Sequence, residues 1–314
     1  MPSTILRDQF RGMGSTVVVE ITDGTPGHLM LARDRLSFLE ARWSRFRRFS
    51  DLSRLNAAQG EPVVVDPATL VLLEAMVNAY VVTDGSFDPT LLSPLVRLGY
   101  ASSVHDRSAV TELPPGAQHR GFIKGLSIDV DALTARLPPG TMVDAGGIGK
   151  GLAADMVAEQ LMANGVAGAM VAVGGDVRVM GEAPDPDGWR VPVDGAFDPE
   201  EHIATITLSS GALGSSGTLR RSWIADDGQF AHHVLDPANG RPLPGGFDSP
   251  VHAVVLAPTA VEAEMHATMA IVRGAPSALP RLQQDRLPAR LVYGTGRAYT
   301  NAAWESVVGS DLQE

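Results

Sequence analysis

The chain has 314 residues, of which 25 are Lys or Arg, 36 are Asp or Glu and none is Cys. This length predicts one or two domains with a core large enough to need no disulfide or zinc staple. The absence of Cys excludes disulfides, thiolate metal sites, a cysteine nucleophile and a lipidated N-terminal Cys.

The formal net charge of −11 argues against non-specific binding to nucleic acid or to an anionic membrane. A phosphate could still be held locally by one Lys or by a helix N-terminus. The start of the chain lacks a basic region followed by an apolar one, and no apolar run approaches the roughly 18 residues that span a bilayer. We therefore expect a cytoplasmic protein with no membrane anchor.

The first third of the sequence predicts one strand and three helices. Within residues 10–21 we expect a short turn followed by a strand over 16–21. Apolar residues at helical spacing indicate a helix over 29–46. A second helix is expected over 67–83, with Pro67 in its first turn, and a third over 91–98.

The middle of the chain alternates loops with regular segments. Pro and Gly clusters at 113–116 and 137–140 bracket a strand-like piece over 121–130. The most orderly stretch is a βαβ-like unit, with a strand over 141–145, a helix over 149–164 and a strand over 169–173.

Strands and helices are mixed, rather than strictly alternating, in the rest of the chain. Short strands dominate 177–256, a helix is expected over 259–272 and a strand over 289–294. This order predicts an α+β fold with mixed sheets and flanking helices rather than a doubly wound sheet. No linker or repeat divides the sequence, so we expect a single intertwined domain over 1–314.

A glycine-rich turn over 144–151 is the first candidate site. Its glycines would let backbone N–H groups approach a phosphate at the start of the following helix, with Lys150 adding a full charge. It is not a Walker A loop, because Asp144 and Gly151 stand where Gly and Ser or Thr are needed. The stretch 149–154 fits the loose pattern G-x-G-x-x-A, but the expected acidic residue is missing. From the loop alone, a turn with a solvated Lys is an equal alternative.

A second candidate site is the predicted helix around residues 261–268. Helical spacing places Glu264 and Thr268 on one face, and Glu262 and His266 on the next. A carboxylate and a hydroxyl form a hard-oxygen set that suits Mg²⁺. In isolation, however, a polar helix face exposed to water is the more common arrangement.

Two further segments contain candidate polar residues. His233 has the side chain of a general base near neutral pH, and Asp236 follows closely enough to orient it; the alternative is a half-buried His at the end of a strand. In the segment 83–90, Asp88 or Ser86 could bind a ligand hydroxyl or amide, but either could equally cap a helix that begins near Pro89, and capping alone is the favoured interpretation. No G-x-S-x-G motif surrounds the serines near Gly217, which excludes a serine hydrolase of that type.

The order of these motifs is more informative than any one of them. Eight blocks between about residue 10 and residue 300 resemble, in sequence order, the ApbE family of FAD:protein FMN transferases. The blocks are Met13-Gly-Ser-Thr16, Ser44-Arg-Phe46 with Ser50–Asn56, Asp84–Thr90, Asp144–Gly151 with Asp155, Gly174-Gly-Asp176, Ser216-Gly217, His233–Pro237 with Gly240-Arg-Pro242, and Ala263–Thr268.

The resemblance implies an α+β flavin transferase fold that binds FAD in a central groove. With Mg²⁺, or Mn²⁺ in its place, such an enzyme joins FMN from FAD through a phosphoester to a Thr or Ser hydroxyl of an acceptor flavoprotein and releases AMP. The positions that match FAD contacts are Met13, Phe46, Ser86, Phe87, Asp88, Asp144, Lys150 and Val234. The positions that match metal ligands are Gly147, through its carbonyl, Glu264 and Thr268. His233 matches the catalytic base.

The sequence also departs from the family pattern. Glu264 stands where the family usually has Asp, and His266 where it has an apolar residue. Leu219 replaces an aromatic residue, and Phe46 replaces a common Tyr. Two alternatives therefore stay open, a Mg²⁺-dependent FAD pyrophosphatase and a non-catalytic flavin-binding protein. A dinucleotide-dependent oxidoreductase has only the G-x-G-x-x-A match in its favour.

Overall fold

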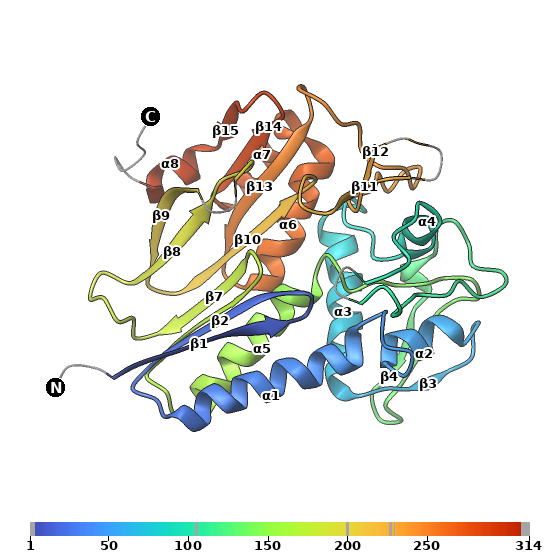
Figure 1. Ribbon diagram of the computed structural model, residues 1–314, viewed down its shortest axis with the longest axis horizontal. Coiled ribbons are helices and arrows are strands. Elements are labelled where there is room, and N and C mark those ends of the chain that lie inside the picture. The colour runs from blue at the N-terminus through green and yellow to red at the C-terminus, as the bar shows by residue number, and fades with distance from the viewer. Residues whose placement is uncertain (1–3, 104–105, 199–200, 226–227, 229, 309–314) are drawn as a thin grey trace. The chain divides into compact units, whose positions relative to one another are not determined.

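The computed structural model describes residues 4–103, 106–198, 201–225, 228 and 230–308. The chain forms two compact units, which we call the sheet unit and the helical unit (Figure 1). The sheet unit consists of Met1–Ser37, Lys150–Leu219 and Pro244–Glu314, and the helical unit of Phe38–Gly149 and Arg220–Leu243. Each unit is thus assembled from segments far apart in the sequence.

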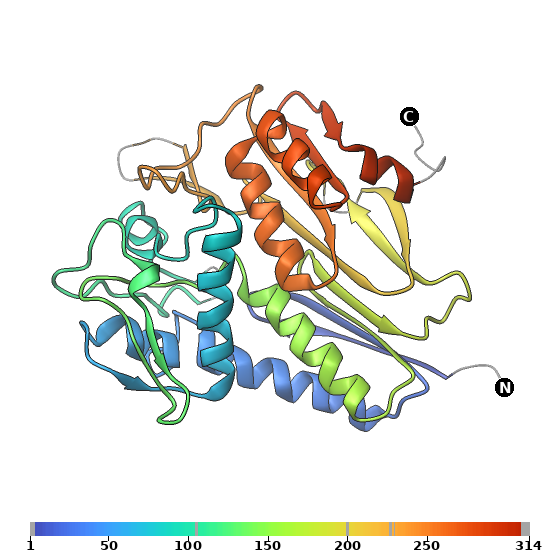
Figure 2. The same cartoon turned by 180° about the vertical axis from the view of Figure 1, so that it is seen from behind.

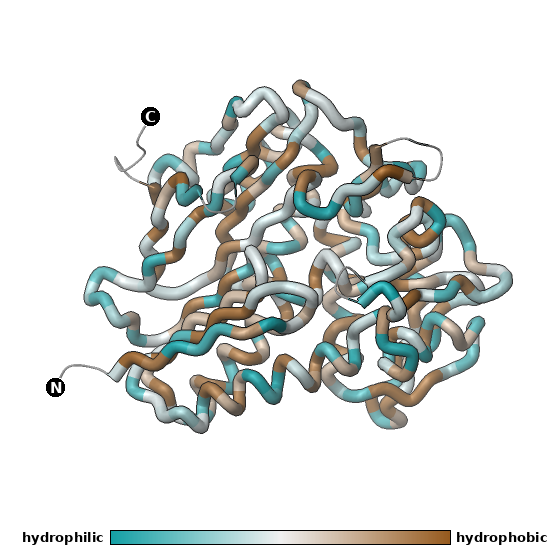
Figure 3. The backbone as a smooth tube through the Cα atoms, in the orientation of Figure 1, coloured by the Kyte–Doolittle hydropathy of each residue, from teal (hydrophilic) through white to brown (hydrophobic). Residues whose placement is uncertain are grey.

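The sheet unit is built on an eight-stranded sheet, in which every strand pair of the described residues is antiparallel. Its strands are, in spatial order, β1 (Ile5–Gly12), β2 (Ser15–Thr22), β6 (Gly168–Val173), β7 (Asp176–Gly181), β10 (Gly211–Gly217), β13 (Pro250–Ala257), β14 (Ala289–Tyr293) and β15 (Ala298–Thr300). The central strands are rich in apolar residues, as the brown segments of β13 show in Figure 3.

Helices cover one face of this sheet and a hairpin covers part of the other. Figure 2 shows α5 (Gly149–Ala163), α6 (Ala260–Arg273) and α7 (Ala275–Gln284) side by side on one face. On the other lie the hairpin of β8 (Trp189–Asp194) and β9 (His202–Leu208), and α8 (Ala302–Val308) (Figure 1).

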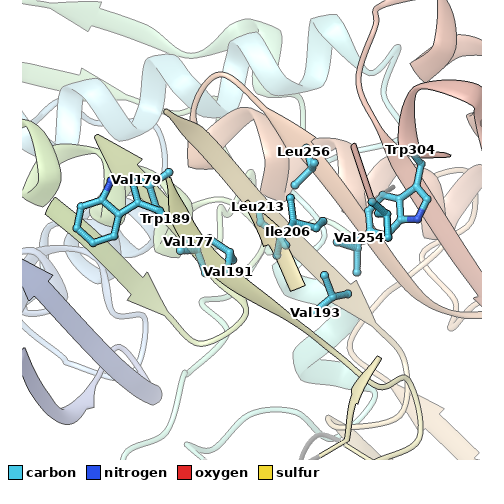
Figure 4. Packing of buried hydrophobic residues seen from close by; sticks show 11 residues of the cluster. Val177, Val179, Trp189, Val191, Val193, Ile206, Leu213, Val254, Leu256 and Trp304 are labelled. Carbon is cyan, nitrogen blue, oxygen red and sulfur yellow. The ribbon is translucent and has the colours of Figure 1, made fainter. Parts of the chain in front are cut away.

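The hairpin is held to the sheet by alternating apolar residues. Trp189, Val191 and Val193 of β8 are buried, whereas Arg190 and Pro192 between them are exposed, because successive side chains of a strand point to opposite faces. Figure 4 shows these residues packed with others from β7, β9, β10, β13 and α8 in one buried cluster.

The described residues of the helical unit form one long helix, several short helices and two small sheets. Its elements are α2 (Asp51–Ala57), α3 (Pro67–Val82), α4 (Leu92–Arg97), the 3₁₀ helix η1 (Ile123–Gly125), the sheet β3 (Val63–Val64), β5 (Thr134–Arg136) and β4 (Ser127–Asp129), and the hairpin β11 (Ser222–Ile224) with β12 (Phe230–His232). The helix α1 (Pro26–Trp43) begins in the sheet unit and ends in the helical unit. In the described residues, no helix has the length and apolar character needed to cross a membrane.

The α+β prediction is confirmed, together with most of its elements. The helices expected over 29–46, 67–83, 91–98, 149–164 and 259–272 are α1, α3, α4, α5 and α6, and the strands expected over 16–21, 169–173 and 289–294 are β2, β6 and β14. α3 starts where Pro67 and the side chain of Asp66 indicate, since Asp66 Oδ1 accepts the N–H of Ala68 at 2.9 Å.

The prediction of a βαβ-like unit over residues 141–173 is wrong. Residues 141–145 form no strand, and β6 pairs with antiparallel neighbours only. The side chain of Asn56 bonds both the N–H and the C=O of Val143, at 2.8 and 2.9 Å, so this backbone is satisfied without a neighbouring strand. Within the strand-like piece over 121–130, only β4 is a strand.

Candidate functional site

A buried charge cluster in the sheet unit surrounds Lys150, in the first turn of α5. Its ammonium contacts the carboxylate of Asp176, at the start of β7, and lies 2.8 Å from Oε1 of Glu264 on α6. Asp176 is fully buried and Glu264 is 2% exposed. Two buried carboxylates therefore face one ammonium, which leaves one negative charge uncompensated when all three groups are ionised.

Burial and the charges of neighbouring groups shift the pKa values of both Glu264 and Lys150. Burial, together with the neighbouring Asp176 carboxylate, raises the pKa of Glu264 to about 7, although Lys150 and the N–H of Gly151 oppose the shift. Burial alone would lower the pKa of Lys150, but the carboxylates of Asp176 and Glu264 outweigh it and hold that pKa above its usual range. Lys150 is therefore a cation at neutral pH.

The second oxygen of Glu264 is bonded to the start of α5. Oε2 accepts the N–H of Gly151 at 2.8 Å. The first four N–H groups of a helix have no partner within it, and a carboxylate is favourable beside the positive end of the helix dipole. Glu264 thus links α6 to the first turn of α5 as well as to Lys150.

Glu264 and Thr268 together have the chemistry of a hard-metal site. Thr268 lies one helical turn after Glu264 and is half-buried. A carboxylate oxygen that accepts one hydrogen bond still has a lone pair, and oxygen donors with an uncompensated negative charge fit Mg²⁺. The described residues contain no group of three or more His, Cys, Asp or Glu that could hold a metal ion.

The alternative that the polar face of α6 is exposed to water is wrong. Glu264 is buried, and so is His266, at 6% exposed, whose Nδ1 bonds the backbone carbonyl of Glu262 at 2.9 Å. Burial lowers the pKa of His266, which keeps the ring neutral at pH 7.

Gly147, the third predicted metal ligand, belongs to the helical unit. That its carbonyl binds a metal stays a prediction.

Met13 occupies a constrained position in the sheet unit. It and Gly14 form the two-residue turn between β1 and β2, and both have positive φ, at 50° and 68°. This is the type I′ geometry that matches the twist of the strands. A side chain other than Gly in this conformation costs roughly 1–2 kcal/mol, and the role of Met13 as a flavin contact stays a prediction.

In the helical unit, Arg45 organises two of the predicted flavin contacts. Its side chain is 3% exposed, and its Nε lies 3.5 Å from Oδ2 of Asp144. The guanidinium also lies 4.1 Å from the ring centre of Phe46 and bonds the Tyr100 carbonyl at 2.9 Å. Burial lowers the pKa of Arg45, but an Arg stays protonated in proteins. Arg45 therefore contacts both the carboxylate of Asp144 and the ring of Phe46.

The segment with Ser86, Phe87 and Asp88 is mainly held by its own hydrogen bonds. Asp88 Oδ1 accepts the N–H and hydroxyl of Thr90 at 2.9 and 2.6 Å, and its Oδ2 lies 3.2 Å from Arg120 Nε. Phe87 is 4% exposed. α4 begins only at Leu92. Asp88 therefore stabilises the turn before α4 and does not cap this helix directly, whereas the capping alternative predicted that it would.

His233 follows β12 and is half-buried, and Val234 beside it is buried. Its Nδ1 lies 3.4 Å from the carbonyl of Arg221. Because a carbonyl only accepts, this contact favours the tautomer that carries its proton on Nδ1. The carboxylate of Asp236 instead accepts hydrogen bonds from Ala238 N and Asn239 Nδ2, at 2.9 and 2.6 Å.

The predicted site residues thus fall into two groups. Met13, Lys150, Glu264 and Thr268 are in the sheet unit, and Phe46, Ser86, Phe87, Asp88, Asp144, Gly147, His233 and Val234 are in the helical unit. The structure brings Lys150 into contact with Glu264. Sequence analysis missed the roles of Asp176 and Arg45, although each stands inside a motif block, Gly174-Gly-Asp176 and Ser44-Arg-Phe46.

Comparisons with known proteins identify the family of this chain. The profile of the ApbE family matches residues 13–291. The chain is 27% identical over 267 residues to an FAD:protein FMN transferase of Vibrio cholerae serotype O1, covering 84% of this chain and 78% of that one. It is also 27% identical over 266 residues to the FAD:protein FMN transferase of Escherichia coli K12, covering 82% and 74%.

Solved structures share the fold. The ApbE protein of Thermotoga maritima superposes with a TM-score of 0.83 at 21% identity, covering 98% of this chain and all of that one. The flavin transferase ApbE from Vibrio cholerae gives a TM-score of 0.77 at 23% identity, with the same coverage. With the family profile matching most of its length, this chain belongs to the ApbE family.

Proposed function

We propose that this protein transfers FMN from FAD to the hydroxyl of a Thr or Ser in an acceptor protein, forming a phosphoester and releasing AMP. The observation that carries the proposal is the buried cluster of Lys150, Asp176 and Glu264, in a chain that belongs to the ApbE family. Transfer of this kind requires neutralised phosphate charge, an in-line nucleophile and a group that takes its proton.

Lys150 supplies the fixed positive charge. Its ammonium has three N–H donors, and Asp176 and Glu264 use two of them. The third is available to a phosphate oxygen of FAD. The two carboxylates hold the ammonium in place, so Lys150 does not have to be ordered when the dinucleotide binds.

His233 takes the proton of the acceptor hydroxyl. In this step the hydroxyl oxygen forms a bond to the phosphorus of the FMN moiety, the bond from that phosphorus to the oxygen of the AMP phosphate breaks, and AMP leaves with the electron pair. The contact of Nδ1 with the carbonyl of Arg221 supports this assignment, because it favours the tautomer in which Nε2 is the acceptor.

Glu264 and Thr268 are the residues that would hold a divalent cation, together with the carbonyl of Gly147. Mg²⁺ or Mn²⁺ bound there would supply charge neutralisation at the pyrophosphate. Phe46 offers a ring to the flavin, and Asp144, held by Arg45, offers a carboxylate to a hydrogen-bond donor of FAD. Met13, Ser86, Phe87, Asp88 and Val234 complete the proposed contacts.

Intact-mass spectrometry tests this function. The protein is incubated with FAD, Mg²⁺ or Mn²⁺, and purified candidate acceptor proteins that present an exposed Thr or Ser. We expect the acceptor to gain the mass of FMN less one water, and AMP to accumulate in equal amount. A matched reaction with EDTA, and one with an acceptor whose modified Thr or Ser is changed to Ala, should show no gain.

Two other outcomes contradict the proposal in different ways. AMP and free FMN without a modified acceptor would assign the protein as an FAD pyrophosphatase, in which water replaces the hydroxyl. FAD binding without turnover in either metal would make it a non-catalytic flavin-binding protein.

A further inference from the structure

The first turn of α6 is held by a carboxylate of the neighbouring helix. Asp155, on α5, is 4% exposed, and its two oxygens accept the backbone N–H groups of Ala260 and Val261 at 2.8 and 2.9 Å. These N–H groups belong to the set that a helix cannot satisfy internally. α6 also has its own cap, since Thr259 Oγ1 accepts the N–H of Glu262 at 3.4 Å. Asp155 therefore does more than cap α6, because it ties that helix to α5.

Arg178 extends this link to the sheet. Its Nε lies 3.2 Å from Asp155 Oδ1, and its Nη1 donates to the carbonyls of Gly211 and Pro258 at 2.9 and 2.7 Å. Arg178 is 8% exposed, and the planar fork of its guanidinium fixes the directions of its donors. One side chain of β7 thus joins α5, the start of β10 and the segment that enters α6.

Two close approaches fix how near α6 lies to its neighbours. A Cβ on Gly151 would lie 2.3 Å from the carbonyl oxygen of Ala260, and one on Gly214 would lie 2.3 Å from the carbonyl carbon of Ala263. These glycines bring α6 against α5 and against β10. They determine separation, whereas the hydrogen bonds of Asp155 determine where along its axis α6 begins.

The axial position of α6 decides where Glu264 points. A slip of one residue would move each side chain by about 1.5 Å along the axis and about 100° around it. Glu264 follows Val261 by three residues, and its carboxylate meets both Lys150 Nζ and the Gly151 N–H, each at 2.8 Å. Either contact would be lost by such a slip.

We propose that Asp155 and Arg178 are positioning residues, which set the register of α6 against α5 so that Glu264 meets Lys150 and the first turn of α5. The geometric part of this proposal is independent of the reaction. Its consequence for catalysis, a correctly placed Glu264, rests on the proposed function.

Backbone amide exchange at Gly151 tests the geometric part, because this N–H is bonded by Glu264 and lies in the first turn of α5. In Asp155→Asn, one acceptor becomes an amide donor that faces an N–H group. We expect exchange at Gly151 to accelerate by about tenfold, while amides in β6 and β13 keep their wild-type rates. Arg178→Lys, which keeps the charge but loses the fork, should give a smaller acceleration at the same amide.

Thr259→Ala is the matched control, since it removes the side-chain cap of α6 and leaves Asp155 in place. We expect it to lower the melting temperature without accelerating exchange at Gly151 relative to β6 and β13. Unchanged exchange at Gly151 in both Asp155→Asn and Arg178→Lys would overturn the proposal. So would acceleration spread equally over β6 and β13, which would show only general destabilisation.

A kinetic readout tests the consequence. In Asp155→Asn, the Mg²⁺ concentration for half-maximal FMN transfer should rise by about 10- to 100-fold, while the KM for FAD stays at the wild-type value. A fall in kcat with an unchanged Mg²⁺ requirement would contradict it. If the wild-type protein transfers no FMN, the proposed function fails, but the exchange measurement still decides the positioning proposal.

Discussion

At the scale of single residues, the central feature is a lysine that balances two buried carboxylates. Two separate sequence motifs contain Lys150 and Glu264, but neither motif predicts that these side chains are in contact, because 114 residues separate them in the chain. Asp176 was part of a recognised block and had no predicted role, since nothing in the local pattern shows which way a residue at the start of β7 faces. Residue types are thus readable from motif order, whereas their partners depend on the fold.

Lys150→Met should strongly destabilise the protein, because it leaves the buried Asp176 and Glu264 without a cation. We expect a loss of about 3–5 kcal/mol in the free energy of unfolding, measured by urea denaturation. Lys150→Met combined with Asp176→Asn should recover part of this loss. As a control, Lys124→Met at an exposed position should stay within about 0.5 kcal/mol of wild type. A double variant no more stable than Lys150→Met would contradict the charge balance described here.

His233→Ala should lower the rate of FMN transfer by about 10²- to 10⁴-fold, the usual contribution of a general base. FAD affinity, measured by flavin fluorescence titration, should stay close to wild type, because the base acts on the acceptor hydroxyl. His119→Ala serves as the matched control, since His119 is an exposed histidine of the same unit. A parallel loss of FAD binding in His233→Ala would count against its assignment as the base.

At the scale of elements, the arrangement depends on how closely α6 can approach α5. Gly151→Ala would place a methyl group 2.3 Å from the carbonyl oxygen of Ala260. We expect this overpacking to cost about 1–3 kcal/mol in unfolding free energy. Gly27→Ala, in the first turn of α1, meets nothing nearer than 3.5 Å and should be neutral or stabilise by up to about 1 kcal/mol. Equal effects of the two substitutions would show that the close approach is not required.

The elements that were predicted are those with a strong local signal. α3, α5 and α6 combine apolar spacing with a Pro, Gly or Thr at their starts, and all three were expected. β1 was not predicted because its sequence, ILRDQFRG, is charged. It lies at the edge of the sheet, where its residues alternate between exposed and half-buried and none is fully buried. The prediction of a strand over 141–145 was wrong because the side chain of Asn56, 87 residues away, bonds the backbone N–H and C=O of Val143. No local pattern contains that information.

At the scale of the whole molecule, the chain passes between the two units four times, after Ser37, Gly149, Leu219 and Leu243. Neither unit is a continuous segment, so neither can be cut out of the sequence as an independent chain. The single intertwined domain expected from the sequence predicts one cooperative unfolding transition. Differential scanning calorimetry should give equal calorimetric and van't Hoff enthalpies, and two resolved transitions would contradict that prediction.

The membership of the ApbE family and the buried cluster around Lys150 lead to the same central claim, that this protein modifies another protein with FMN. The most direct test is the intact mass of an acceptor after incubation with the enzyme, FAD and Mg²⁺. We predict an acceptor heavier by FMN less one water, with the rate of this gain lowered by about 10²- to 10⁴-fold in His233→Ala. An unmodified acceptor accompanied by free FMN and AMP would contradict the claim.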